Sequence, residues 1–497
     1  MYLRKFALFA LAASLLGAGV AWSQTVFDQV GFSALQSRLG AGMPTGAGVE
    51  VMMGEALTGP NQYMPDVSSA QFTGKTLTDR SGSGSVSGHA TSVANWFFGN
   101  TSGIARGVTA INNYKVAGDL SAGDWFGSTY LNFGAGLPVP EPTQRVQNHS
   151  WIATGTFDAA LQEIHRRYDY ALRRDNVLGV VGVNNGTSTV PPLLGNTYNG
   201  IAVGLTSGNS SNGPSTGDVP GRSKPDIVAP LNFTSFATPV VAGAGALLIQ
   251  TADALGNPSA GRIEVLKSVL LSGATKTEFT SLAQPWNRTN NGSFIEPLDR
   301  RFGAGELNID FSHLILTAGQ KNGTDLQLDG PRGWDFPTLN TVAETRTYFI
   351  NIPDGFSVEF SATANWLRRI DPTGTGSNVF ATSDATLSTI ELRLFATNPD
   401  LTLAALIDSS LSPIDNVQHI YRNDLLPDTT YALELTLAGL PTGQTSEDIG
   451  ISWIAVVAVP EPQTVLSLSV AGLAVFVFVR RRWLRHQDPA IEADAAE

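Results

Sequence analysis

The chain has 497 residues, with 31 Lys and Arg against 43 Asp and Glu, a formal net charge of −12 and no Cys. The missing cysteines exclude disulfide scaffolds, thiolate metal sites and thiol catalysis. The acidic balance argues against nucleic-acid binding, which needs a basic surface. A chain of this length can form two or three domains with buried cores of their own. Its low charged fraction of 15% and its 51 Gly are typical of an exported protein with a loop-rich surface.

Residues 1–23 have the pattern of a secretory signal peptide. Arg4 and Lys5 precede an uncharged apolar stretch from Phe6 to Val20, and an Ala-Trp-Ser sequence at 21–23 provides small residues for cleavage. A segment of this kind is removed on export, so we leave it out of the fold prediction. The alternative is an N-terminal membrane helix that is not cleaved.

After a short N-terminal segment at 24–45, strand-like and helix-like patterns alternate from 46 to 316. The predicted elements are a buried strand at 48–53, an amphipathic helix at 157–172, strands at 177–183, 201–203 and 227–228, and a buried helix at 235–255. Alternation of this kind predicts an α/β fold, with a mostly parallel sheet covered by helices on both faces.

Beyond residue 320 the pattern changes to period two. Apolar and polar residues alternate at 347–352, 356–364, 390–395, 431–437 and 449–455, and Asn, Asp, Gly and Pro separate these runs. We therefore expect an antiparallel β-sandwich domain over 320–456. It could assist secretion, bind polysaccharide or only space the first domain from a membrane. Trp366 could stack on a sugar, although a core position is the commoner one for Trp.

The C-terminus has three consecutive features of a membrane-sorting segment. Val-Pro-Glu-Pro at 459–462 is followed by an uncharged run from Gln463 to Val479 and by four Arg within residues 480–485. As a helix the uncharged run would span about 25 Å, at the short limit for a bilayer. The Arg cluster predicts that the following end is cytoplasmic.

This ending resembles the PEP-CTERM sorting signal of Gram-negative envelope proteins. The resemblance implies a transient anchor at 459–485, which an exosortase removes, and a cytoplasmic tail at 486–497. It places the protein in the cell envelope, anchored to the inner membrane and then released to the periplasm, the outer surface or the extracellular matrix. A permanent anchor is the alternative.

The most specific motif of the chain is Thr-Ser-Phe-Ala-Thr-Pro-Val-Val-Ala-Gly at 234–243. It places Ser235 at the start of the predicted buried helix and Pro239 in its first turn, where a missing N–H costs no hydrogen bond. Free N–H groups and the positive end of the helix dipole favour negative charge that develops beside Ser235. From this motif alone, Ser235 could equally be an ordinary N-cap residue.

Five further segments join this motif in one order along the chain. They are Ser-Gly-His-Ala-Thr-Ser-Val-Ala at 87–94, Gly-Ile-Ala-Arg-Gly-Val at 103–108, Asn-His-Ser-Trp at 148–151, Val-Val-Gly-Val-Asn-Asn-Gly at 180–186 and Gly-Arg-Ser-Lys-Pro-Asp-Ile-Val-Ala-Pro at 221–230. Together the six segments resemble the motifs of subtilisin-like serine proteases (subtilases, peptidase S8).

The resemblance implies a subtilisin-like peptidase domain over 46–316 that acts on polypeptides. By carry-over, Ser235 would attack the scissile carbonyl, and His89 would take its proton and pass it to the leaving amine. Asn184 and the Ser235 backbone N–H would donate to the oxyanion. The strand at 148–151 would bind substrate through Asn148, Ser150 and Trp151. We expect neither a cofactor nor a metal ion.

The acid position departs from the family pattern. Glu55, in the sequence Val-Glu-Val-Met-Met-Gly-Glu at 49–55, stands where subtilases have Asp. Glu carries the same charge on one more methylene, and we expect Gly54, without a side chain, to provide the extra room. Asp66 and Asp79 are the nearest Asp residues, but they lie outside this frame.

Other departures concern family glycines. Phe233, Ala90 and Ile152 replace them, so we expect altered or narrowed access for the substrate. The segment at 24–45 is also too short for the inhibitory propeptide of about 70 residues that many subtilases carry.

We therefore expect an exported serine endopeptidase, either membrane-anchored or sorted by an exosortase, with Glu in the acid position. Its expected partners are a polypeptide substrate, a sorting enzyme of the exosortase type and the membrane. The alternative is a catalytically degenerate subtilase scaffold with an adhesive or matrix-binding role. The presence of nucleophile, base and oxyanion residues together favours the enzyme.

Overall fold

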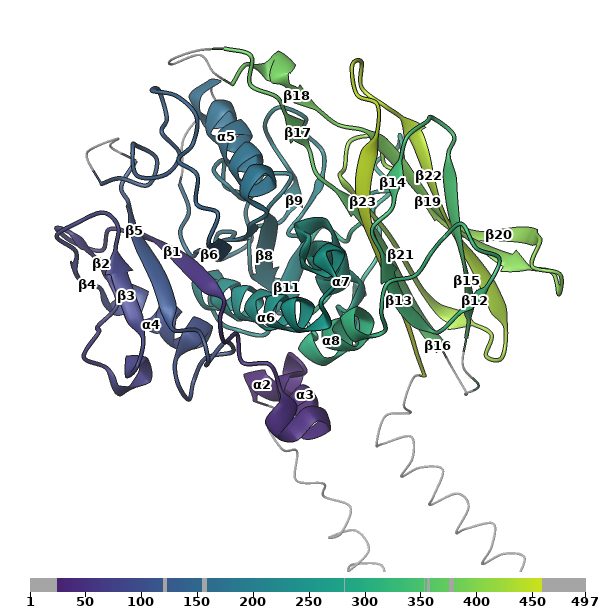
Figure 1. Ribbon diagram of the computed structural model, residues 1–497, viewed down its shortest axis with the longest axis horizontal. Coiled ribbons are helices and arrows are strands. Elements are labelled where there is room, and N and C mark those ends of the chain that lie inside the picture. Colours follow the sequence, from purple (N-terminus) through teal and green to yellow (C-terminus); the bar gives the residue numbers. More distant parts are fainter. Residues whose placement is uncertain are drawn as a thin grey trace, which may run out of the picture.

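The computed structural model describes residues 25–457, except 119–122, 154–158, 281, 353, 355–357 and 375–379. The predicted signal peptide and sorting segment lie outside the described residues. Figure 1 shows an α/β part, which contains the helices, packed beside an all-β part.

A seven-stranded sheet, parallel throughout, forms the centre of the α/β part, in the order β11-β8-β7-β6-β1-β5-β3. Its strands are β1 (Glu50–Ala56), β3 (Thr76–Asp79), β5 (Ala110–Val116), β6 (Gln144–His149), β7 (Leu178–Gly182), β8 (Ile201–Leu205) and β11 (Ile227–Ala229). Every residue of β7, β8 and β11 is buried, as expected for strands covered on both faces. The predicted parallel sheet is confirmed.

Helices cover the two faces of this sheet. On one face lies α6 (Thr234–Leu255), against which α4 (Gly88–Phe98) packs, and on the other lies α5 (Ala159–Asp175). Two glycines of β7 allow helices α6 and α5 to approach the sheet closely. A Cβ at Gly182 would lie 2.8 Å from the Thr238 hydroxyl of α6. A Cβ at Gly179 would lie 2.5 Å from the Tyr168 hydroxyl of α5. Among the described residues, α6 is the one helix long and apolar enough to cross a membrane, but it is buried as the core helix of this part.

The N-terminal segment belongs to the same folded unit. Its helices α2 (Val26–Gln29) and α3 (Phe32–Leu39) lie below α8 (Ile309–Thr317) in Figure 1. The Arg38 guanidinium of α3 lies 2.7 Å from the Asp310 carboxylate of α8. The α/β part also contains the short strands β2 (Gln62–Met64), β4 (Ser85–Val86), β9 (Gly213–Pro214) and β10 (Ser223–Lys224), the helix α7 (Ile263–Ser272) and several single turns of 3-10 helix.

The all-β part consists of two sheets packed face to face. One has the order β12-β15-β22-β19-β20, and the other has β13-β23-β16-β21 with β14 also on β23. The first sheet contains β12 (Leu328–Asp329), β15 (Thr345–Asn351), β19 (Thr389–Thr397), β20 (Leu403–Ser410) and β22 (Thr430–Gly439). The second contains β13 (Arg332–Asp335), β14 (Thr338–Leu339), β16 (Val358–Trp366), β21 (Val417–Leu425) and β23 (Glu447–Val457), and β17 (Arg369–Ile370) pairs separately with β18 (Ala385–Thr386).

The predicted sandwich is therefore present, with one correction. The β12–β15 pair is parallel, because the chain passes through β13 and β14 of the other sheet between these two strands. Trp366 is completely buried in the core between the sheets, and its indole N–H donates to the Ser388 carbonyl over 3.0 Å. It is a core residue, not an exposed surface for a sugar.

The sandwich also packs closely on the α/β part through helix α7. A Cβ at Gly450 of β23 would lie 2.2 Å from the carbonyl oxygen of Glu264 in α7, so strand and helix backbones are nearly in contact. The Ser272 hydroxyl of α7 donates to the Ser452 carbonyl over 3.0 Å. Trp334 and Ile454 of the sandwich belong to the same apolar core as the parallel sheet. The sandwich is thus packed tightly against the α/β part and shares its apolar core.

Candidate active site

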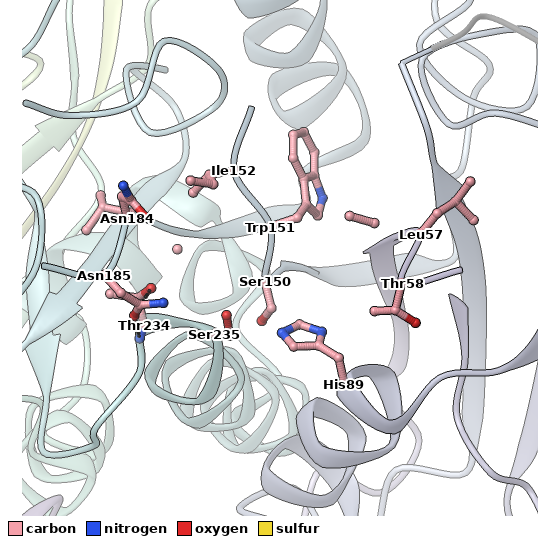
Figure 2. A pocket seen from close by; sticks show the side chains of 13 residues that line it. Leu57, Thr58, His89, Ser150, Trp151, Ile152, Asn184, Asn185, Thr234 and Ser235 are labelled. Carbon is pink, nitrogen blue, oxygen red and sulfur yellow. Dashed lines mark hydrogen bonds between the residues drawn. The ribbon is translucent and has the colours of Figure 1, made fainter. Parts of the chain in front are cut away.

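A pocket of about 270 Å³ lies where β1, β6 and β7 end and α6 begins. The carboxyl edge of a parallel sheet is the usual place for a binding site in such folds. In Figure 2, Ser150 and Ser235 lie beside the His89 ring, with Asn184 and Asn185 to one side and Thr58 to the other. The wall consists of Ala56, Leu57, Thr58, His89, Ser150, Trp151, Ile152, Gly182, Val183, Asn184, Asn185, Thr234 and Ser235.

Ser235 is the second residue of α6 and does not cap this helix. The N-cap residue is Phe233, which makes no side-chain capping bond. Instead the Asn185 side-chain oxygen accepts from the Thr234 backbone N–H over 2.8 Å, while the N–H groups of Phe236 and Ala237 donate to the Phe233 carbonyl. The Ser235 backbone N–H donates no hydrogen bond to any other residue that the structure describes. The capping interpretation is therefore wrong, and this N–H is available at the pocket.

Pro239 lies in the second turn of α6, not in the first as predicted, because the helix already begins at Thr234. A proline at this position cannot donate to the carbonyl of Ser235 four residues earlier. The missing N–H therefore removes one helical hydrogen bond at the residue that faces the pocket.

His89 and Glu55 form a hydrogen-bonded pair. Glu55 is the next-to-last residue of β1, and His89 is the second residue of α4, whose N-cap Ser87 accepts from the Ala90 N–H over 3.2 Å. His89 Nδ1 lies 2.8 Å from Glu55 Oε2. The Glu55 side chain is fully buried, whereas 32% of the His89 side chain is exposed. The other ring nitrogen, Nε2, is consequently the one left for the pocket.

The electrostatics of this pair follow from its burial. Burial raises the pKa of Glu55, and the hydrogen bond and charge of His89 oppose that rise. The hydrogen bond from Glu55 raises the pKa of His89, and burial of the ring works against it. Each partner thus stabilises the charged form of the other in a site where water is scarce.

Neither alternative acid reaches His89. Asp66 accepts hydrogen bonds from the backbone N–H and hydroxyl of Ser68, in a local turn. Asp79 accepts from the Tyr63 hydroxyl over 2.7 Å and from backbone N–H groups of the loop that follows it. Of the three candidates, the structure pairs only Glu55 with His89.

Gly54 has a different role from the predicted one. A Cβ at Gly54 would lie 2.9 Å from Nδ1 of His149, so the glycine makes room for this ring and not for Glu55. Gly54 and Glu55 are on opposite faces of β1, since side chains alternate along a strand. Burial lowers the pKa of His149 to about 3, and the neutral Nδ1 accepts from the Trp151 indole N–H over 3.2 Å. His149 therefore orients Trp151, a role that the sequence did not reveal.

The predicted substrate-binding residues divide into two groups. Ser150 and Trp151 line the pocket, and so does Ile152, which adds a side chain where the family pattern has Gly. Asn148 does not line it: this residue is fully buried, and its amide donates to the Ser150 hydroxyl over 3.0 Å. Asn148 therefore positions Ser150 through this hydrogen bond without itself reaching the pocket wall.

Asn184 is half-buried in the pocket wall at the end of β7. Its backbone N–H donates to the Ser211 hydroxyl over 2.7 Å, and its carbonyl accepts from the Ser211 N–H over 2.9 Å. The neighbouring Asn185 holds the start of α6, as described above. In the sequence, the only indication of this role of Asn185 is that it follows another Asn.

Within the described residues, no group of three or more His, Cys, Asp or Glu could hold a metal ion.

Residues 62–305 match the subtilase family, peptidase S8. The chain therefore carries a peptidase domain of this family of serine proteases. The match includes His89, Asn184 and Ser235 but begins after Glu55. Among curated protein sequences, none matches this chain.

Solved structures of proteases overlap with this domain at low identity. The prenylagaramide maturation protease PagA has 21% identity and a TM-score of 0.38, covering 57% of this chain and 98% of its own. The patellamide maturation protease PatA has 20% identity and a TM-score of 0.34, covering 55% of this chain and 100% of its own. A protease of Pseudoalteromonas arctica has 16% identity and a TM-score of 0.35, covering 58% of this chain and 97% of its own.

Proposed function

We propose that this protein is a serine endopeptidase that cleaves polypeptides with Ser235 as nucleophile, His89 as base and Glu55 as the orienting acid. The observation that carries the proposal is the 2.8 Å contact between Glu55 Oε2 and His89 Nδ1, in a pocket that Ser235 also lines. A buried carboxylate on one ring nitrogen fixes the tautomer that leaves the other nitrogen free to accept a proton.

In the proposed reaction the Ser235 hydroxyl attacks the scissile carbonyl carbon while His89 Nε2 takes its proton. The Ser235 N–H and the Asn184 side chain donate to the oxyanion that forms. The carbon–nitrogen bond then breaks as His89 returns the proton to the leaving amine. Water hydrolyses the acyl-enzyme by the same steps in reverse order, and Glu55 stabilises the imidazolium in both halves.

The adhesive, non-hydrolytic scaffold is the weaker alternative. Such a protein needs neither a free N–H at Ser235 nor a fully buried carboxylate hydrogen-bonded to a partly exposed histidine. A buried charge is costly unless it is paired. The pair is easier to understand as part of a catalytic site.

We also propose that the protein is exported through residues 1–23 and reaches the Gram-negative cell envelope. The segment 459–485 would anchor it in the inner membrane and present it to an exosortase-type enzyme, after which it could be released. The support for these steps is the order of motif, apolar run and Arg cluster in the sequence.

A fluorophosphonate probe tests the nucleophile in the full-length chain, because this reagent modifies only an activated serine. We expect wild type to be labelled and Ser235→Ala to lose both labelling and peptide hydrolysis. Ser207→Ala removes an exposed serine outside the pocket wall and serves as the matched control, with labelling retained. Labelling that persists in Ser235→Ala, or an unlabelled wild type, would contradict the proposal.

A further inference from the structure

Two phenylalanines flank the active site at the start of α6. The Phe236 ring stacks on the His89 ring, with 6.3 Å between centroids and 29° between planes. Phe236 also packs against the core of the α/β part. Phe233 meets Phe236 edge to face, with centroids 5.7 Å apart, and half of Phe233 is exposed. We call these two residues the aromatic pair.

The aromatic pair does not belong to the pocket wall described above. In Figure 2, Asn184 lies on one side of that pocket, and His89 lies towards the other side, where Thr58 also lines it. The aromatic pair lies next to this pocket at His89, because the Phe236 ring stacks on the histidine ring. An exposed phenylalanine beside a polar catalytic group offers apolar surface to whatever lies next to that group.

The mechanism determines which part of a substrate lies beside His89 and the aromatic pair. His89 Nε2 has to deliver a proton to the leaving amine, so this amine must lie within hydrogen-bonding distance of the ring. The residue that carries the amine is the first one after the scissile bond. Its side chain must therefore lie near the rings that surround His89, and among these the aromatic pair provides an apolar surface.

We propose that Phe233 and Phe236 form a subsite for an apolar or aromatic side chain on the residue that follows the scissile bond. This inference rests on the proposed function and specifies its substrate class. Burial of such a side chain against Phe233 removes apolar surface of both partners from water, and aromatic partners gain further from edge-to-face contact. Phe236, held between the core and His89, keeps Phe233 in position.

The inference is tested by aminolysis of the acyl-enzyme, because the subsite then binds the incoming amine. The full-length enzyme is acylated with a peptide methyl ester, which releases methanol. Added amino-acid amides compete with water for the ester carbonyl at Ser235: the amine nitrogen bonds to the carbonyl carbon, the Ser235 oxygen leaves, and His89 takes a proton from the amine and returns one to Ser235. The measured quantity is the ratio of peptide product to hydrolysed product. It is independent of the amount of active enzyme.

For wild type we expect phenylalanine amide or leucine amide to exceed glycine amide in this ratio by roughly fivefold to thirtyfold. Phe233→Ser should reduce the preference to about twofold or less. Leu255→Ser, at the far end of the same helix and similarly exposed at 42%, is the matched control and should keep the wild-type preference.

Each outcome decides between the two proposals. Equal use of glycine and phenylalanine amides by wild type, or an unchanged preference in Phe233→Ser, would overturn the aromatic subsite while the hydrolysis of the ester still supports the protease. A wild-type enzyme that does not cleave the ester at all would overturn the proposed function, and the subsite with it.

Discussion

Glu55 is the residue in which this site departs most from the family pattern. It lies at the end of β1, is completely buried and contacts Nδ1 of His89. The added methylene does not require a gap at Gly54, since that position faces His149. The longer side chain reaches the histidine from the strand itself.

Glu55→Gln is expected to lower kcat by about four orders of magnitude, because the neutral amide no longer stabilises the imidazolium or selects the tautomer. Glu55→Asp keeps the charge and loses only reach, so it should retain more activity than Glu55→Gln. Steady-state kinetics on a peptide substrate measure both variants. Equal rates for wild type and Glu55→Gln would remove Glu55 from the mechanism.

The same pair sets the pH dependence of the enzyme. Only neutral His89 can accept the proton of Ser235, so kcat/KM should fall as the pH drops through the His89 pKa. Glu55 raises this pKa above its ordinary value of 6.5, and the acidic limb of the wild-type profile should therefore lie above pH 6.5. In Glu55→Gln the limb should move to lower pH, because the charge that favours the imidazolium is gone. Coinciding limbs in the two profiles would contradict this assignment.

Among the secondary-structure elements, α6 and α7 connect the site to the rest of the molecule. Helix α6 carries Ser235 at its N-terminal end and is buried along the parallel sheet. Helix α7 lies between this sheet and the sandwich, where its backbone almost touches Gly450 of β23. A small residue is required there because no side chain fits between the helix carbonyl and the strand.

Gly450→Ala is expected to destabilise the protein by about 2–3 kcal/mol, since a Cβ placed 2.2 Å from the Glu264 carbonyl oxygen forces strand and helix apart. Thermal or urea unfolding measures the change. Gly330→Ala is the matched control: nothing lies within 4 Å of its Cβ, and the variant should remain within about 0.5 kcal/mol of wild type. Equal stability of the two variants would show that the contact of β23 with α7 is not close in solution.

At the scale of the whole molecule, the sandwich and the α/β part are joined by buried polar contacts as well as by the shared core. Asp218 accepts hydrogen bonds from Arg166 of α5 and from Arg368 beyond β16. The Asn416 amide of the sandwich donates to the Tyr198 carbonyl over 2.9 Å. Tyr198 belongs to the loop between β7 and β8, which follows Asn184 of the site. The sandwich thus supports a loop that begins at the pocket.

The proposed membrane anchor at 459–485 would determine where the whole protein resides in the cell. Deletion of residues 460–497 should move the protein from membrane to soluble fractions, in a host without exosortase. Gln463–Val479 is the expected span, whereas the apolar helix α6 is buried in the core. Deletion of 486–497 alone removes only the tail and should leave the protein in the membrane. If the variant that lacks residues 460–497 stays in membrane fractions, another segment must anchor the protein.

Much of this architecture could be predicted from local sequence patterns. Alternating strand and helix patterns indicated the parallel sheet, and period-two patterns indicated the sandwich, because the side-chain period reflects which face is buried. Ser235, His89 and Glu55 were identified as candidates from short motifs, and the structure brings all three to the end of the same sheet. The predictions of strands and helices need only residues that are close together in the chain, whereas the catalytic candidates also depended on the order of six motifs between residues 87 and 243.

The other features depend on contacts between segments far apart in the sequence, and only the tertiary structure decided them. The Asn148 amide donates to Ser150, Gly54 faces His149, and Phe236 stacks on His89. The sandwich docks on α7 instead of standing apart, because its second sheet has an outer face that is buried against the α/β core. The sequence by itself therefore determined which elements form and which residues are candidates for the chemistry. The packing of those elements decided which side chains reach the pocket, since a side chain's neighbours are set by the fold and not by its position in a motif.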